Sequence, residues 1–334
     1  MEQRRFSGKG HWYHETQSNH SQTDVLPLVP EAAYVDDRFL LDLALPEEIV
    51  AGCERWLAPA RALCHQLFPL NVAVSRLRTL SAYDRLSTAL TVAQACGVQR
   101  LCNHYAALLA PLPGPDSSRE SNRRLAQITQ YARQLASSPD VIDDKAQQQL
   151  DEVGLTTYDI VLISQIIGFT GFQARVVAAF QAFLGHPVRW LPGHHIQPHA
   201  LISDTPRTPG EWESILPVVE LRYASAQQLE LLARCQAQPE LEALTPVLCH
   251  EPALLALTGE ILTGGIRSSA NDASSVELAG AIALLNASPD RFSAAQFTPL
   301  IQSGLSEVQA INLLTWSAFN GWLDRLGIAL GKGE

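Results

Sequence analysis

Hydrophobic residues recur at three- and four-residue steps along most of the 334-residue chain, a spacing that predicts helices. The pattern predicts helices over residues 46–68, 81–96, 98–109 and 121–136, a short helix that ends near residue 150, a long helix from Thr156, and further helix over 215–259. Pro59 is a possible break in the first of these. Hydrophobic and polar residues never alternate for long, so strand signals are nearly absent. We therefore predict an all-α fold.

One stretch of the sequence occurs twice. Residues 138–180 open with Ser-Pro-Asp, reach Gly-Leu at 154–155 and continue into a long apolar run, and residues 288–330 repeat this order without a gap. Residues 135–179 and 285–329 share eleven identities, where average composition would give roughly three by chance. Thr156 with Asp159, and Ser306 with Gln309, have the spacing of a capping box at the start of each long helix. Gly154 is expected to end the short helix before it, and Gly168 and Gly171 in the long helix predict a tight helix crossing.

Proline, glycine and histidine mark the segments outside these helices. Residues 1–46 are polar and then proline-punctuated, which predicts an extended N-terminal arm laid over the core, and residues 186–213 are predicted to link two units at 47–185 and 214–334. Histidines in the arm and the linker could meet a metal, but a structural role is the alternative, and we predict no metal and no cofactor. These residues are His11, His14, Glu15 and His20 in the arm and His194, His195 and His199 in the linker.

Charge and composition limit the classes of function. The net charge is −10, and Lys and Arg form no cluster beyond residues 4–5 and 123–124, which argues against nucleic acid or an anionic membrane as partner. The N-terminus has no apolar core of a signal peptide, and no uninterrupted apolar run reaches the roughly 18 residues of a membrane span. A cytoplasmic protein is expected, so its six cysteines, none in a Cys-x-x-Cys pair, are expected to be free thiols.

The repeated order of elements resembles the carboxymuconolactone decarboxylase and AhpD-like alkylhydroperoxidase superfamily. The residues that carry the resemblance are LASSPDVIDDKAQQQLDEVGLTTYDIVLISQIIGFTGFQARVVAAFQAFLG and its second copy LNASPDRFSAAQFTPLIQSGLSEVQAINLLTWSAFNGWLDRLGIALG. It covers most of residues 121–185 and 274–331, and the resemblance is loose over 70–120 and 215–270. The resemblance implies two tandem AhpD-like helical units and assembly into a homo-oligomer. Arg175 and Arg325, which end the repeated motif, are expected to pair with a carboxylate at a helix or subunit contact.

The chemistry of this family lies in the loosely matching half, where its peroxidases use a Cys-x-x-Cys at a helix start with a Glu and a His that relay protons. In this chain Cys102 falls at the second Cys, Gln99 at the first, Ser87 at the Glu and Ala106 at the His. The second unit keeps Cys249 and His250 without a paired cysteine. The resemblance thus makes Cys102, Cys96 and His104 the candidate catalytic residues, and Cys249 and His250 the candidate binding residues.

Three interpretations stay open at this point. The first is a thiol-dependent oxidoreductase of peroxidase type, with Cys96 and Cys102 brought together at Gly97. The second is non-redox chemistry of decarboxylase type on a small organic substrate, with Asp84, His104 or His250 as the base. The third is a non-catalytic binding or assembly module on the same scaffold.

Overall fold

A computed structural model describes residues 35–188, 211–266 and 276–333, and it confirms the all-α class. The sites suggested for the arm and linker histidines lie outside these residues. In the first half the elements are α2 (Glu47–Leu67), α3 (Ala82–Cys96), α4 (Gln99–Leu109), α5 (Arg119–Ser137), η2 (Pro139–Val141), α6 (Asp144–Glu152) and α7 (Thr157–Phe183). In the second half they are β1 (Trp212–Ser214), η4 (Leu221–Tyr223), α8 (Ala226–Gln236), α9 (Thr245–Leu248), α10 (Pro252–Ile261), η5 (Leu262–Ile266), α11 (Val276–Ala287), η7 (Pro289–Arg291), α12 (Ala294–Gln302), α13 (Glu307–Leu330) and β2 (Gly331–Gly333).

The repeated sequence folds into the same series of elements twice, α5-η2-α6-α7 and α11-η7-α12-α13. The predicted capping boxes are present at the start of both long helices, where Thr156 pairs with Asp159 and Ser306 with Gln309. Gly154 adopts φ +84° after α6, and its repeat partner Gly304 adopts φ +103°, a conformation in which a side chain would be strained. Local sequence signals therefore set the boundaries of these elements.

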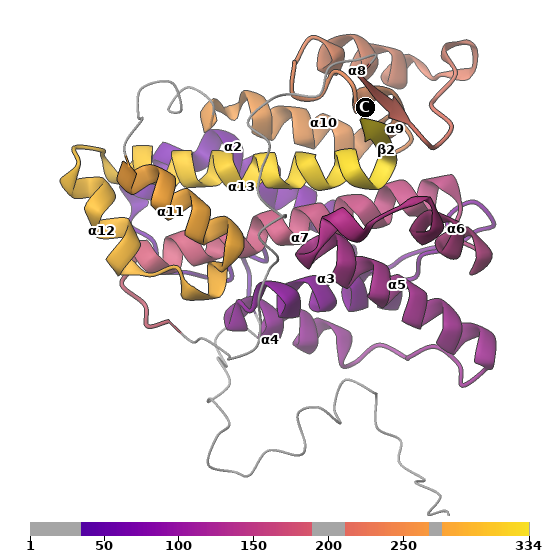
Figure 1. Ribbon diagram of the computed structural model, residues 1–334, viewed down its shortest axis with the longest axis horizontal. Helices are drawn as coiled ribbons and strands as arrows, with labels where there is room; N and C mark the ends of the chain where they lie inside the picture. The colour runs from indigo at the N-terminus through magenta and orange to yellow at the C-terminus, as the bar shows by residue number, and fades with distance from the viewer. Residues whose placement is uncertain (1–34, 189–210, 267–275, 334) are drawn as a thin grey trace, which may run out of the picture.

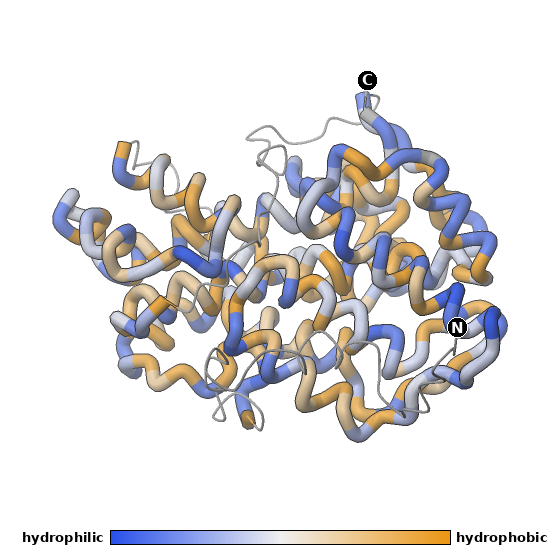
Figure 2. Tube along the Cα trace, turned by 60° about the horizontal axis from the view of Figure 1, so that its bottom comes forward, coloured by the Kyte–Doolittle hydropathy of each residue, from blue (hydrophilic) through white to orange (hydrophobic). Residues whose placement is uncertain are grey.

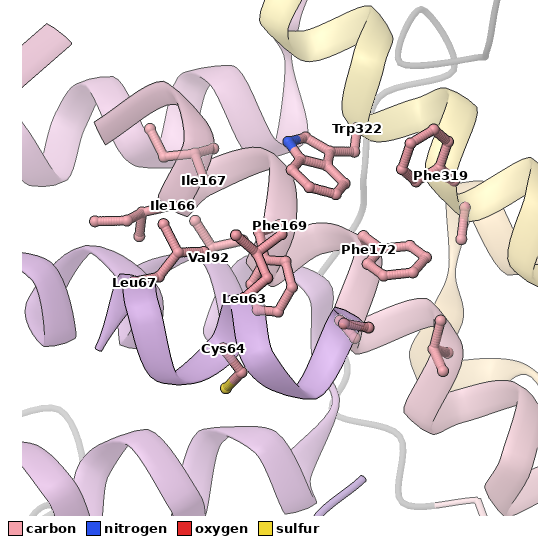
Figure 3. Close-up of a cluster of buried hydrophobic side chains, with 14 of the residues drawn as sticks. Leu63, Cys64, Leu67, Val92, Ile166, Ile167, Phe169, Phe172, Phe319 and Trp322 are labelled. Atoms are coloured by element: carbon pink, nitrogen blue, oxygen red, sulfur yellow. The ribbon is translucent and has the colours of Figure 1, made fainter. Parts of the chain in front are cut away.

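The two long helices, α7 and α13, pack on each other and form the centre of the molecule (Figure 1). Aromatic rings fill the contact, and their pairing is reciprocal: Phe169 meets Trp322 edge-on at 5.7 Å between ring centroids, and the corresponding Phe319 meets Phe172 at 6.0 Å. Figure 3 shows Phe319 and Trp322 of α13 turned toward Phe169 and Phe172 of α7. Burial of these large rings is a main source of stability for the core.

Gly168 confirms that this crossing is tight, although the group that approaches it is a side chain. A Cβ atom added at Gly168 would lie 2.0 Å from Cδ1 of Trp322, so only glycine leaves room for the indole ring. Gly171 has a different role, because its nearest neighbour is Nη1 of its own helix's Arg175. Of these two glycines, Gly168 is therefore the one that determines the helix approach.

Helix α2 joins the two halves, because it belongs to the 47–185 segment but packs on α10, η5 and α13 of the second. Nε1 of Trp56 donates to Oδ1 of Asn312 on α13 at 2.9 Å. The helix runs through Pro59 without a break. The carbonyl of Arg55, which a proline at 59 cannot hydrogen-bond, lies against Gly264, where a Cβ would come within 2.7 Å of that oxygen. The carbonyl that Pro59 leaves without its usual helix partner is therefore packed against η5.

Residues 35–46, assigned from sequence to the arm, include part of the core. Phe39 is fully buried and its ring contacts those of Phe169 and Phe172. Gln173 of α7 donates from Nε2 to the carbonyls of Arg38 and Phe39 at 2.8 and 2.9 Å. The end of the arm is therefore inserted among the helices and held by hydrogen bonds to its backbone.

The second half is less regular than its sequence predicts. The region over 215–259 is divided among the short elements η4, α8, α9 and α10, and β1 pairs with β2 antiparallel, which the hydrophobic pattern did not indicate. Hydrophobic and hydrophilic positions are interspersed along the chain in Figure 2, as the packing of amphipathic helices requires. By contrast, α7 is apolar and long enough to cross a membrane by length and composition, although polar residues interrupt its apolar run, and the qualifying window is entirely buried inside the fold. A core helix of this kind meets the same criteria of length and composition.

Candidate functional site

Two arginines lie buried where the repeats meet, and each reaches into the other repeat. Arg175 donates from Nη1 to the carbonyl of Gly171 in its own helix and from Nη2 to the carbonyl of Asn286 at the end of α11, at 2.8 and 2.7 Å. Arg325 makes the corresponding pair of bonds, to Gly321 and to Ala136 at the end of α5, both at 2.9 Å. The two side chains are 2% and 3% exposed. The prediction that these arginines pair with a carboxylate is wrong, because the hydrogen-bond acceptors are backbone carbonyls. Two of them, those of Asn286 and Ala136, lie in the last turns of α11 and α5, where helix carbonyls carry partial negative charge.

The thiol of Cys96 interacts with this arginine pair. It is coupled electrostatically to the guanidinium groups of both Arg175 and Arg325. Burial is the main cause of a lowered pKa of Arg175, and the Cys96 thiol acts in the opposite direction. Burial, followed by the neighbouring charge of Arg175, lowers the pKa of Arg325 to about 9.

Cys102 is the second thiol of this group. Its side chain is half-buried on the first turn of α4, and Cys96 is the last residue of α3. Burial, and after it the interaction with Cys96, raises the pKa of Cys102 to about 12. Cys96 and Cys102 therefore interact electrostatically across the Gly97 turn, and burial favours the neutral form of the Cys102 thiol.

The Gly97 turn also forms part of a pocket of about 220 Å³. Gly97 has φ +71° and ends α3, and a Cβ there would lie 2.9 Å from Cβ of Asp290 in η7, so this turn needs glycine for both reasons. The first residues of α4, including Gln99, line one side, and the C-terminal part of α7 and residues 289–292 line the others. The pocket thus opens at the seam between the repeats, one residue away from Cys96.

His104 occupies a different environment. It is 1% exposed, and its ring packs edge-on against Tyr105 with the centroids 5.3 Å apart. The hydroxyl of Tyr105 donates to Oε1 of Gln173 at 2.6 Å, which links α4 to α7. The ring of His104 is therefore placed in the core of the first half.

The candidate binding residues of the second half lie apart from the Gly97 turn. Cys249 is fully buried beside Cys235 of α8, and burial is the main cause that raises its pKa to about 11. The ring of His250 meets Tyr158 edge-on at 5.1 Å, and its Nε2 is 2.7 Å from the carbonyl oxygen of Pro217. In Figure 1, α9 and α4 lie well apart, so Cys249 and Cys235 are separate from Cys96 and Cys102.

The part of the chain that the structure describes contains no group of three or more His, Cys, Asp and Glu side chains that could hold a metal ion. The residues that sequence reasoning missed are Arg175 and Arg325 as neighbours of Cys96. The sequence did mark both arginines, because they lie at the same place in the two copies of the repeat. Their contact with a cysteine from outside the repeat could not be read from the sequence.

The fold and the site together define an all-α protein with an internal repeat and two buried guanidinium groups that interact electrostatically with the thiol of Cys96. No family model matches this chain, and no curated protein shows significant similarity to it. The resemblance to AhpD-like proteins therefore stays a prediction drawn from the residues.

Proposed function

We propose that this protein is a thiol-dependent oxidoreductase in which Cys96 is the attacking thiol and Cys102 the resolving thiol. The observation that carries the proposal is the position of Cys96 at the end of α3, where it interacts electrostatically with Arg175 and, across the Gly97 turn, with Cys102. The nucleophile in thiol chemistry is the thiolate. These roles differ from those implied by the resemblance, in which Cys102 is the primary candidate.

The proposed cycle has three steps. Cys96 attacks the O–O bond of a hydroperoxide, which is reduced to the alcohol as Cys96 becomes a sulfenic acid. The thiol of Cys102 then attacks that sulfur and forms a disulfide, with release of water. An external dithiol reduces the disulfide by exchange and is itself oxidised. The high pKa of Cys102 argues against it as the thiol that attacks the peroxide and leaves it the resolving role, in which the target is the electrophilic sulfur of a sulfenic acid.

The test is mass spectrometry of the whole chain after stoichiometric peroxide. Trypsin cleaves after Arg100 and so separates the two thiols, which means that a disulfide appears as a cross-link between two peptides. We expect this cross-link in the unmodified protein, and a trapped sulfenic acid on Cys96 in Cys102→Ser.

Cys53 and Cys64 are internal controls. Both are buried, and burial is the main cause that raises the pKa of each to about 12, so both should stay reduced. Oxidation of Cys96 no faster than that of these two thiols, with no cross-link, would refute the proposal.

A second candidate function is binding of a small molecule without chemistry in the pocket at the Gly97 turn. The observation that favours it is the pKa of Cys102, which burial raises so far that this thiol is a poor nucleophile at neutral pH. A thermal-shift screen with small thiols, hydroperoxides and organic acids tests this candidate, since a ligand that binds the folded state raises the melting temperature. Loss of that shift in Gln99→Leu, at a residue that lines the pocket, would locate the binding.

A further inference from the structure

The loop before α3, residues 69–80, contacts the second half of the chain through Arg78. Nη1 of this residue forms an ion pair with Oε1 of Glu251, the residue that precedes α10. The two side chains are 43% and 13% exposed, so the carboxylate is the more deeply buried partner. The guanidinium also lies over the ring of Tyr158 in the first turn of α7, with Cζ 5.0 Å from the ring centroid. Arg78 therefore joins this loop to both halves.

The rest of the loop is held to the first half by polar contacts. The hydroxyl of Thr79 donates to the carboxylate of Asp159 at 2.7 Å, and its N–H donates to the same group at 2.8 Å. The hydroxyl of Thr156 donates to the carbonyl of Leu77, also at 2.7 Å. The large apolar side chains that the loop exposes are those of Leu70, Val74 and Leu77. The outer part of the loop buries little apolar surface, so its position depends on these polar contacts.

The ion pair depends on the charge of Glu251. Burial raises the pKa of the Glu251 carboxyl above its ordinary value, and the charge of Arg78 is the first of the effects that lower it. When Arg78 leaves, this lowering effect is lost, so the carboxyl binds its proton more tightly in the open form, and protonation favours that form. Because burial has already raised the pKa, the change begins at a higher pH than an exposed glutamate would need. The charged and titratable groups that face Glu251 or its arginine partners are Arg78, Arg85, His250, Tyr158, Asp84 and Asp159.

We propose that Arg78 and Glu251 form a pH-sensitive latch, which holds the 69–80 loop against the second half at neutral pH and releases it when Glu251 is protonated. The anchor of Thr79 on Asp159 stays in place, so the release is confined to the outer part of the loop. Release uncovers the face of Tyr158 that Arg78 occupies, and it frees the segment that carries the exposed apolar side chains. This inference does not depend on the proposed thiol chemistry.

Hydrogen exchange of the 69–80 loop in the full chain measures the release, expressed as a protection factor that is corrected for the intrinsic effect of pH on exchange. The N–H of Ser75 donates to the carbonyl of Arg78 at 2.8 Å, so protection at Ser75 reports on the closed loop. We expect this protection to fall about tenfold or more between about pH 7.5 and about pH 5, the effect of losing one hydrogen bond between charged groups. Glu251→Gln should show the low value at both pH values, because it removes the charge.

Glu152→Gln is the matched control, because Glu152 of α6 forms an exposed ion pair with Arg123 of α5 at 2.9 Å. It should leave the protection of the 69–80 loop and its pH dependence unchanged. The melting temperature separates local release from a general loss of structure. In Glu251→Gln the loop should lose protection while the melting temperature stays unchanged or rises.

If Glu251→Gln does not fold, Arg78→Gln removes the other member of the pair and should show the same low protection at both pH values. A loop that stays protected in whichever variant folds would overturn the inference. A pH-dependent drop that persists in that variant would do so as well, because another group, such as His250, would then be responsible. The unmodified protein is a test by itself, since a loop that keeps its protection at the lower pH would contradict the latch.

Discussion

The contact between Gly168 and Trp322 leads to a prediction that uses the repeat itself as a guide. The position that corresponds to Gly168 in the second copy is Ala318, and the position that corresponds to Trp322 in the first copy is Phe172. The larger ring thus faces the residue without a side chain, and the smaller ring belongs with the alanine. We expect Gly168→Ala to destabilise the protein and Trp322→Phe to compensate for it.

The magnitude follows from the geometry. A Cβ at Gly168 would lie 2.0, 2.7 and 3.1 Å from Cδ1, Nε1 and Cγ of the indole, all shorter than ordinary contacts, so the ring must move within a packed core. Overpacking of this kind typically costs about 1–3 kcal/mol. Alanine also favours the helix over glycine by roughly 0.5–1 kcal/mol, which offsets part of that cost. The net loss in the free energy of unfolding should therefore be about 1–2 kcal/mol, with the cost at the upper part of its range because the clash is so short.

The assay is equilibrium unfolding in urea of the two single variants and of the double variant Gly168→Ala/Trp322→Phe. Trp322→Phe alone should lose packing but no hydrogen bond, because Nε1 of Trp322 is buried without a partner among the described residues. The double variant should be more stable than the sum of the single effects predicts, by about 1 kcal/mol or more.

Gly280→Ala is the matched control, since Gly280 lies in α11 and no atom comes within 4 Å of a Cβ placed there. It should be stabilising by roughly 0.5–1 kcal/mol. If Gly168→Ala were as stabilising as this control, or if the double variant showed no compensation, the reasoning from the indole contact would be wrong.

Three further predictions concern other buried groups. Gln173→Leu should cost about 3 kcal/mol, because it leaves two carbonyls and the Tyr105 hydroxyl without a partner, whereas Tyr105→Phe should cost about 1 kcal/mol; urea unfolding of both variants checks the difference. Burial raises the pKa of Cys53 from 9.0 to about 12, so its contribution to stability is fully present below pH 9 and is lost as the pH rises toward 12. Under reducing conditions, the free energy of unfolding should accordingly fall with pH less steeply above pH 9 in Cys53→Ala than in the unmodified chain, and equal slopes would contradict this. Burial raises the pKa of Glu251 and outweighs the ion pair with Arg78, which lowers it. Glu251→Gln at pH 7 should therefore leave the melting temperature unchanged or higher. Arg78→Ala should lower the melting temperature, because it takes the ion-pair partner away from the buried carboxylate.

The two arginines connect the repeats by hydrogen bonds. Each repeat supplies a guanidinium to the end of the other's first helix, and each supplies the carbonyl that the other arginine needs. Neither set of bonds is complete within one copy. Substitutions at Arg175 and Arg325 should therefore affect the contact between the repeats and not only the helix that carries them.

Much of the fold could be predicted from local sequence, because the signals involved act over a few residues. Ser81 and Asp84 form a capping box that starts α3 where the hydrophobic pattern begins, and Gly97 ends the same helix because its φ of +71° suits glycine. The region 215–259 shows the limit of this reasoning. Its apolar residues have helical spacing, but tertiary contacts divide it into short elements, and the pairing of β1 with β2 depends on residues more than a hundred positions apart.

For the site, the sequence by itself determined the residue types and their place in the repeat. It identified Cys96, Cys102 and the recurring arginine, because those depend only on order and spacing along the chain. Only the tertiary structure decided that the Cys96 thiol interacts with Arg175 and with Arg325, which comes from the second half of the chain. It also decided how far burial, and not the identity of the neighbours in sequence, raises the pKa of Cys102 and Cys249. Electrostatic environment is a sum over groups that are near in space, and most of these groups are distant in sequence.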